Sequence, residues 1–217
     1  MNINKINLNV AKCASTEKSR YHLNGIHFTK GFCEATNGNI LARITYPTQF
    51  PLEEIPEQIK TGSKDDLKEF IIPLDGVKDI PIVKGKVRLP ILAETYIDVE
   101  QANNNGTVKF QTTNLETTPT AEIRKIDGEF PDTSAVWPKD ENAVFEICLD
   151  PALLKKICET GDIGIRSTIM TFTFYGNMAP VKVRSRNSET EQEFTGLIMP
   201  MRGDAREFKP NVEIKGV

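Results

Sequence analysis

The chain has 217 residues, of which 39% are hydrophobic and 26% charged, and its formal net charge at pH 7 is −3. This composition is ordinary for a soluble globular protein, and the length accommodates one or two domains. The negative net charge excludes a protein that coats nucleic acid with its whole surface, but it allows a locally basic face.

No run of about 18 apolar residues occurs, so no segment is expected to span a membrane. The N-terminal sequence MNINKINLNVAKCA lacks the unbroken apolar stretch of a secretory signal, which predicts a cytoplasmic protein. The cysteines form no C-x-x-C pair, and the histidines have no partner at metal-ligand spacing. We therefore expect buried free thiols, no metal and no cofactor. The residues concerned are Cys13, Cys33, Cys148, Cys158, His22 and His27.

The first quarter of the chain predicts one helix and a set of strands. Residues 3–10 alternate between polar and apolar side chains, which predicts a strand leading into a short helix at about 10–19. Three further strands are expected at 21–28, 31–36 and 39–46. The Asn37-Gly38 pair between apolar runs is a strong hairpin signal. His22 and His27 would face opposite sides of a strand, so we expect hydrogen-bonded or solvated histidines.

The second quarter begins with a connection and continues with strands. Residues 47–68 contain three prolines and indicate a linking segment, although irregular elements of a further repeat could be hidden there. Pro81 prevents a long helix, so only a helical turn is expected within 75–84. Strands are expected at 69–74, 85–92, 94–100, 107–113 and 120–126, with a turn at 103–106.

The stretch IRKIDGEFPDTSAVWP, at 123–138, marks the end of one repeating unit. Asp127-Gly128 permits a change of chain direction, and Phe130-Pro131 favours an extended corner. The pattern predicts a strand, a buried aromatic anchor and an exit linker.

The third part of the chain contains the clearest helix signal. Asp150 and Pro151 supply an N-cap and a proline at the first helical position, and the helix would end near Gly161. Lys155 and Lys156 lie on its polar side. A charged linker is expected at 139–142, strands at 144–149, 165–175, 181–186 and 193–200, and a loosely held tail at 203–217.

Three copies of one pattern follow, each a strand, a short helix and three or four antiparallel strands. They cover about 3–50, 69–138 and 139–202, and an internal repeat of this kind decides the fold. We predict an α+β fold of repeated βαβββ units. The expected organisation is a two-unit domain at 1–138, a third unit at 139–202 and the tail.

Three short sequences resemble segments of the bacterial DNA polymerase III β subunit, the ring-shaped sliding clamp. IDGEFPDTSAVWP resembles the segment that closes a clamp domain, and EATNGNIL resembles a clamp hairpin with Asn37 in place of the usual Asp. FTGLIMPMR, at 194–202, is similar to the C-terminal clamp strand. The resemblance implies a DNA-clamp-like fold, with antiparallel sheets outside and short helices on one face. Three units are fewer than the six or four of clamp chains, and the clamp helix at 75–84 is missing.

The resemblance implies two functional surfaces. Basic residues on helices that line a central hole would contact phosphates of duplex DNA without reading sequence; they are Lys12, Lys18, Arg20, Lys155 and Lys156. An apolar pocket would take a short peptide from a DNA polymerase or another replication protein; its residues are Pro138, Val144, Leu197, Ile198, Met199, Pro200 and Met201. The alternatives are a solvated helix face for the lysines and a core strand for Leu197 and Met199.

No recognisable nucleophile, P-loop or metal motif occurs in the sequence, so the protein is not expected to be an enzyme. The first functional hypothesis is a processivity factor that self-associates into a ring around DNA, as a tetramer of three-unit chains or a trimer of four-unit chains. The second is a clamp-like adaptor or decoy that binds replication proteins without encircling DNA.

Overall fold

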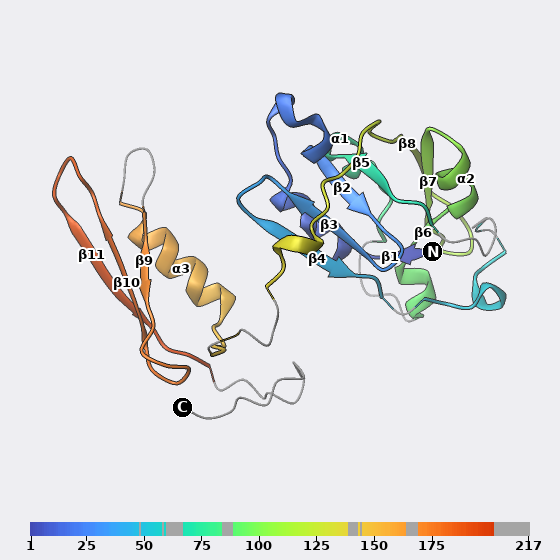
Figure 1. Ribbon diagram of the computed structural model, residues 1–217. Coiled ribbons are helices and arrows are strands. Elements are labelled where there is room, and N and C mark those ends of the chain that lie inside the picture. The colour runs from blue at the N-terminus through green and yellow to red at the C-terminus, as the bar shows by residue number, and fades with distance from the viewer. Residues whose placement is uncertain are drawn as a thin grey trace. The chain divides into compact units, whose positions relative to one another are not determined.

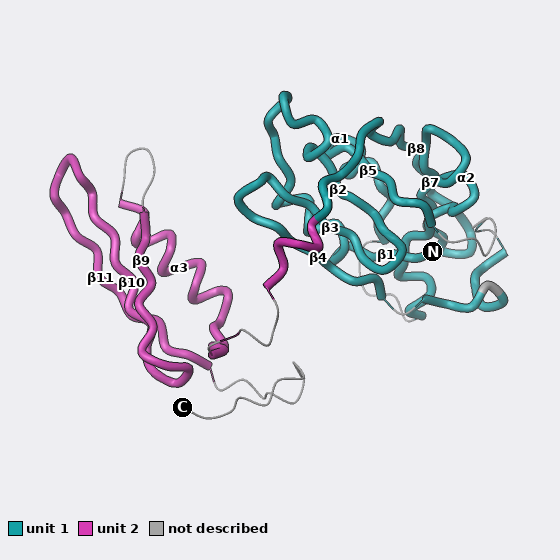
Figure 2. The backbone as a smooth tube through the Cα atoms, in the orientation of Figure 1, with its two compact units in different colours: residues 1–132 teal, residues 133–217 magenta. Residues whose placement is uncertain are grey.

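The computed structural model describes residues 1–47, 49–57, 59, 67–83, 89–138, 143, 145–163 and 169–201. The chain divides into two compact units, residues 1–132 and 133–217 (Figure 2). Within the described residues, no helix has the length and apolar character needed to cross a membrane.

Unit 1 consists of two antiparallel four-stranded sheets, in the orders β4-β3-β2-β5 and β1-β6-β7-β8 (Figure 1). Its strands are β1 (Asn2–Ile3), β2 (Gly25–Phe28), β3 (Phe32–Thr36), β4 (Leu41–Thr45), β5 (Phe70–Pro73), β6 (Thr95–Ile97), β7 (Thr107–Gln111) and β8 (Thr120–Arg124). Its α-helices are α1 (Leu74–Val77) and α2 (Val99–Asn104), and its 3₁₀ helices are η1 (Asn7–Cys13), η2 (Lys18–Leu23), η3 (Leu52–Glu54) and η4 (Pro90–Ala93).

The two repeats of unit 1 exchange their first strands. β5 begins the second repeat but pairs with β2 of the first, with Ile72 opposite Ile26. β1 begins the first repeat but pairs with β6 of the second, with Ile3 opposite Thr95. Each sheet therefore combines three strands of one repeat with the first strand of the other.

Each first strand also contacts the end of its own repeat. The backbone N–H of Ile126, just after β8, donates to the carbonyl of Ile71 in β5 at 2.9 Å. At the matching place in the first repeat, the Gln49 side chain donates to the carbonyl of Asn2 in β1 at 3.0 Å. Each first strand thus links the two sheets, β5 through a backbone hydrogen bond and β1 through the Gln49 side chain.

Both repeats contribute to one hydrophobic core in unit 1. Ile3, Phe28, Ile72 and Phe110 are fully buried in the same cluster. The rings of Phe28 and Phe70 stack with centroids 5.1 Å apart. Because the core contains side chains from both repeats, neither repeat can bury its apolar face alone.

The described part of unit 2 contains one sheet and one long helix. Its elements are η5 (Ser134–Val136), α3 (Pro151–Gly161), β9 (Thr171–Thr173), β10 (Val181–Arg186) and β11 (Glu193–Ile198), and the antiparallel strand order is β11-β10-β9. α3 lies beside the sheet (Figure 1). Its apolar side, with Leu154 and Ile157, packs against Val181, Val183 and Ile198.

The structure confirms an α+β fold with antiparallel sheets and short helices, and several individual elements. The Asp150 side chain caps α3 by accepting from the Ala152 N–H at 2.7 Å. β7 and β8 pair over 107–124, as predicted. Gly38 has φ of +92°, the left-handed conformation that the Asn-Gly turn requires.

Other elements differ from the prediction because side chains form local hydrogen bonds. The strand expected at 3–10 ends at Ile3. In place of the single helix expected at 10–19, the chain forms η1 over Asn7–Cys13 and η2 from Lys18. Asn7 Oδ1 accepts from the Asn4 N–H and Asn4 Oδ1 from the Ile6 N–H, at 3.1 and 2.9 Å, and such bonds turn the chain. Likewise, Asp98 caps α2 within an expected strand and turn.

Three further expectations require correction or remain outside the described structure. Residues 90–93 form η4 instead of part of a strand, while 85–88 lie outside the described residues. Residues 145–149, expected as a strand, pair with no named strand among the described residues. All four cysteines are free, but only Cys33 is fully buried and Cys148 is exposed.

Candidate functional surfaces

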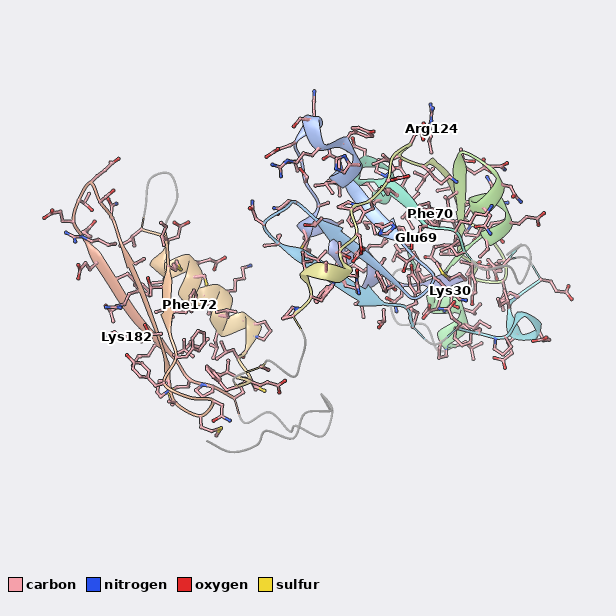
Figure 3. The ribbon with its side chains drawn as sticks, viewed as in Figure 1. Lys30, Glu69, Phe70, Arg124, Phe172 and Lys182 are labelled. Carbon is pink, nitrogen blue, oxygen red and sulfur yellow. The ribbon has the colours of Figure 1, made fainter. Side chains whose placement is uncertain are left out.

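A buried charged cluster in unit 1 contacts Phe130, near the end of that unit. Glu34 is 2% exposed, and its carboxylate contacts His27 Nδ1 at 3.1 Å and Arg43 Nη2 at 2.9 Å. His27 Nε2 lies 3.3 Å from Glu69, which is labelled in Figure 3. The Phe130 ring stacks on His27 with centroids 4.5 Å apart. His27 is thus a satisfied histidine, and Phe130 is the predicted anchor, although it is only half-buried.

The buried thiol and phenols of unit 1 are held in their neutral forms. Burial raises the pKa of Cys33 to about 11, although a side-chain hydrogen bond with Asn7 lowers it in part. Burial also raises the pKa values of the Tyr46 and Tyr96 hydroxyls. A neutral thiol is a poor nucleophile, so burial favours a structural role for Cys33 over a catalytic one.

The cations predicted on the helices of unit 1 are exposed. Lys12 lies in the last turn of η1, and Lys18 and Arg20 lie in η2. Arg20 pairs with Glu17 at 3.3 Å and donates to the Asn37 carbonyl at 3.2 Å. Its guanidinium is therefore partly engaged, while its side chain stays about half exposed.

The two lysines predicted in unit 2 lie on the outer side of α3. Lys155 and Lys156 are exposed, whereas Leu154 and Ile157 face the sheet. Lys155 lies 3.7 Å from Glu159, with its side chain 75% exposed. An ion pair this exposed contributes little to stability, so both ammonium groups remain accessible to an anionic ligand.

A second basic row in unit 2 was not recognised from sequence. β10 alternates buried Val181, Val183 and Ser185 with side chains that face away from α3. This outer row is formed by Lys182, Arg184 and Arg186, and Lys182 is labelled in Figure 3. Its Arg186 lies 3.6 Å from Glu191 and 3.9 Å from Glu193. The alternation in VKVRSR is the sequence signal for this row.

The residues predicted to form a peptide pocket divide between core and surface. Leu197, Met199 and Met201 are 63%, 60% and 53% exposed. Ile198 is instead only 3% exposed and belongs to the core beside Val181, because neighbouring strand residues point to opposite faces. Pro200 is half-buried, Pro138 is exposed, and Val144 lies outside the described residues.

Additional apolar side chains surround the exposed part of β11. Strand pairing places Leu197 opposite Lys182 and Lys182 opposite Thr173, so the residues after Thr173 lie at the same end of the sheet as Met199. We define the apolar end of unit 2 as Phe174, Tyr175, Met178, Leu197, Met199 and Met201, all of them exposed. Aligning the two predicted hairpin turns would have indicated this grouping from sequence.

Comparisons with known proteins identify the fold. No protein-family model matches the chain, and no curated protein matches it significantly. The DNA polymerase sliding clamp of Bacillus subtilis is 16% identical, with a TM-score of 0.60 over 92% of this chain and 48% of that chain. Caulobacter crescentus pol III beta is 18% identical, with a TM-score of 0.54 over 89% of this chain and 48% of that chain.

A third structure supports the same conclusion. A putative DNA polymerase III beta subunit from Eubacterium rectale is 12% identical, with a TM-score of 0.55 over 92% of this chain and 50% of that chain. Identities this low establish fold alone, and the chain spans about half the length of each of these proteins. The chain therefore has the fold of the bacterial DNA polymerase III β sliding clamps over about half of their length.

Proposed function

We propose that the chain is a sliding-clamp-like processivity factor. It self-associates around duplex DNA, tethers replication proteins and catalyses no reaction itself. The observation that carries this proposal is the presence of exposed cations on helices of both units, in a fold shared with DNA polymerase sliding clamps.

The proposed contact with DNA is electrostatic. Lys155 and Lys156 project from the side of α3 that does not pack on the sheet, where they can approach phosphates without reading bases. Lys12, Lys18 and Arg20 are the corresponding cations of unit 1. With a net charge of −3, the chain has little general affinity for DNA, so association should be weak, sequence-independent and salt-sensitive.

The proposed contact with replication proteins is apolar. The apolar end of unit 2 combines three methionines with aromatic side chains, and methionine adapts to partners of different shape. An extended apolar peptide could cover Met199 and Tyr175 without displacing the core beneath them. This surface would tether a DNA polymerase or another replication protein.

A second function is a clamp-like adaptor or decoy that binds replication proteins without encircling DNA. The negative net charge and the engagement of Arg20 by Glu17 favour this alternative. It shares the partner surface with the first proposal and differs in requiring no DNA contact.

Duplex binding by paired charge reversals distinguishes the two functions. Fluorescence anisotropy of a labelled duplex would be recorded from about 20 to 200 mM salt for the full chain and for Lys155→Glu/Lys156→Glu. The double variant should weaken binding and reduce the slope of log K against log salt by about 2, because two phosphate contacts are lost.

The matched control is Lys182→Glu/Arg184→Glu, which makes the same charge change on the opposite face of unit 2. If the outer side of α3 contacts DNA, this control should retain more duplex affinity and more of the salt slope than the Lys155→Glu/Lys156→Glu variant. Equal losses would assign DNA binding to net charge and contradict the helix surface. If the parent chain did not bind the duplex even at low salt, the clamp function would be contradicted and the adaptor function would be favoured.

A further inference from the structure

Unit 2 contains, among its described residues, only one copy of the repeat that is paired in unit 1. In unit 1, the first strand of each repeat adds to the second strand of the other repeat, as β5 does to β2 and β1 does to β6. The three-stranded sheet of unit 2 has the same succession of helix and strands, but β9 pairs only with β10 among the described residues.

Residues 147–150 occupy the position of a first strand in unit 2. Ile71 lies three residues before α1, and Cys148 lies three residues before α3. The Ile126 N–H donates to the Ile71 carbonyl at 2.9 Å, and the Met201 N–H donates to the Cys148 carbonyl at 2.8 Å. The same bond thus joins the first strand to the end of its own repeat in both units.

The opposite edge of the unit 2 sheet is the matching acceptor. β9 is the first strand after the helix, as β2 and β6 are, and both of those strands hold a first strand of the other repeat. Ile169, just before β9, is 84% exposed. An open strand edge beside an exposed apolar side chain is a template for another strand.

Among its described residues, unit 2 does not pair its first-strand segment with β9. Cys148 is bonded to Met201, beyond β11, whereas the open edge belongs to β9 on the far side of β10. Phe145, two residues before this segment, contacts Phe174 just after β9, with ring centroids 5.9 Å apart. Among the described residues, however, no backbone hydrogen bond joins residues 147–150 to β9. A unit with a donor strand and an acceptor edge at opposite ends is complementary to a second copy of itself.

We propose that two copies of this chain exchange residues 147–150 between their second units, each adding the segment to β9 of the other. The resulting two-chain domain reproduces the exchanged strand pairing of unit 1. Its register follows from unit 1, where Ile71 lies opposite His27 and Asn2 opposite Tyr96. Cys148 of one copy then lies opposite Thr171 of the other.

The exchange would complete a core that is small in the single unit. Val181, Val183 and Ile198 are the fully buried members of the unit 2 cluster, while Ile147, Leu149 and Phe172 pack against it only partly buried. Placing Ile147 of one copy opposite Phe172 of the other would remove both side chains from water. Apolar burial of this kind favours association.

This inference specifies the self-association within the proposed function and rests on that function only for its biological purpose. It requires no DNA, because the interface is built from strands and apolar side chains. The experiment below therefore measures association in the absence of DNA and is interpreted separately from duplex binding.

Disulfide formation in the full-length Thr171→Cys variant tests the interface. Directly opposed residues of antiparallel strands have Cα atoms about 4.5–5.5 Å apart, within the range that a disulfide spans. Both Cys148 and Thr171 are exposed in the single copy. Oxidation with copper phenanthroline should convert the variant to a covalent dimer on a non-reducing gel. Mass spectrometry should then identify Cys148 of one copy and the introduced thiol of the other as the linked pair.

Thr195→Cys is the matched control, because Thr195 shares a row with Thr171 across β10 but lies on β11. Its distance from the partner's strand would be three strand spacings, about 14 Å, so no linkage to Cys148 is expected. Analytical ultracentrifugation of the parent chain should give twice the 24.3 kDa monomer mass at high concentration.

A parent chain that stays monomeric at about 100 μM, or a dimer in which Thr171→Cys links no better than Thr195→Cys, would overturn the strand exchange. DNA binding separates this result from the proposed function. Cross-linking without duplex binding would support the interface and contradict the clamp function, whereas duplex binding without cross-linking would contradict only the interface.

Discussion

Units 1 and 2 use the same repeat, but only unit 1 contains two copies among the described residues. In unit 1, β1 and β5 are fully integrated in sheets of the opposite repeat, and Ile3 and Ile72 are fully buried. In unit 2, Leu149 holds the equivalent position and is only half-buried. The first strand is thus buried where it pairs with the other repeat and half-buried where no such pairing is described.

The two units also differ in where their interacting side chains lie. Unit 1 keeps its strongly interacting groups inside, as the ion pairs of Glu34 and the stacked Phe28 illustrate. Unit 2 exposes an apolar end and lysines on α3, and among its described residues the outer edge of β9 has no partner strand. We therefore expect substitutions in unit 1 to change unfolding, and many in unit 2 to change association.

The largest expected effect is the loss of a first-strand side chain from unit 1. Ile72→Ala should destabilise unit 1 by about 2–5 kcal/mol, because it leaves a cavity in a core shared by both repeats. Leu149→Ala removes the equivalent side chain of unit 2 and should cost less than half as much at low protein concentration. Native-state hydrogen exchange with peptide-level mass spectrometry would measure each unit separately.

The stability costs of these two substitutions should depend differently on protein concentration. If a second copy covers Leu149, the cost of Leu149→Ala should grow with concentration, because binding stabilises the folded form. The cost of Ile72→Ala should not change in this way. Equal costs for the two substitutions at low concentration would show that unit 2 is as well packed as unit 1.

The next effect is alkaline destabilisation of unit 1 through Cys33. Burial raises its pKa from 9.0 to about 11, so the folded state retains the thiol proton to a higher pH than the unfolded state. The associated stability is fully present below about pH 9 and is lost as pH rises through about 11. The shift corresponds to at most about 3 kcal/mol.

Cys33→Ala should therefore reduce the fall in unfolding free energy between pH 9 and 11. Cys148→Ala, at the exposed thiol of unit 2, is the matched control and should leave that fall unchanged. Urea titrations at several pH values would compare the slopes of the three proteins. A parent-like slope in Cys33→Ala would mean that other groups cause the alkaline transition.

A smaller effect is expected at the apolar end of unit 2. Met199→Ala should change stability by less than about 0.5 kcal/mol, since the side chain is 60% exposed. It should weaken a bound apolar replication-protein peptide by about 1 kcal/mol or more, as expected of an anchor contact. Thermal melts beside peptide titration would measure both.

Ile198→Ala is the neighbouring control. Because Ile198 is only 3% exposed, this substitution should mainly lower the stability of unit 2. If Met199→Ala instead destabilised unit 2 by several kcal/mol, the residue would belong to the core. A normal melt with unchanged peptide affinity would remove Met199 from the partner surface.

Local signals in the sequence predicted the parts of the fold that local interactions determine. Asp150 and Pro151 define the start of α3, and alternation defines β10 and β11. The exchange of β1 and β5 was not predictable in this way, because strand partners far apart in sequence leave no local pattern. Asp98 is a helix-capping residue, but it lies within the strand expected at 94–100, so the helix that it caps was not predicted.

The candidate surfaces were predictable in part for the same reason. Amphipathic spacing places Lys155 and Lys156 on the outer side of α3, as the structure does. A shared family motif could not distinguish Ile198 from Met199, because burial depends on which face of the sheet each residue occupies. Phe174 and Tyr175 join the surface through strand register, which the sequence specifies only after the hairpins are aligned.

The smallest stability effect in this comparison is expected from reversing the charges on α3. Lys155→Glu/Lys156→Glu should lower the unfolding free energy by only a few tenths of a kcal/mol, because the Lys155 pair with Glu159 is exposed and its replacement adds one repulsion four residues away. Chemical denaturation at low and high salt would measure this cost, which salt should reduce by screening. A cost above about 2 kcal/mol would show that the lysines support unit 2 itself, and a loss of DNA binding in that variant could then not be assigned to phosphate contacts. A small cost together with a strong loss of duplex affinity would assign the outer side of α3 to binding and leave the sheet side to stability.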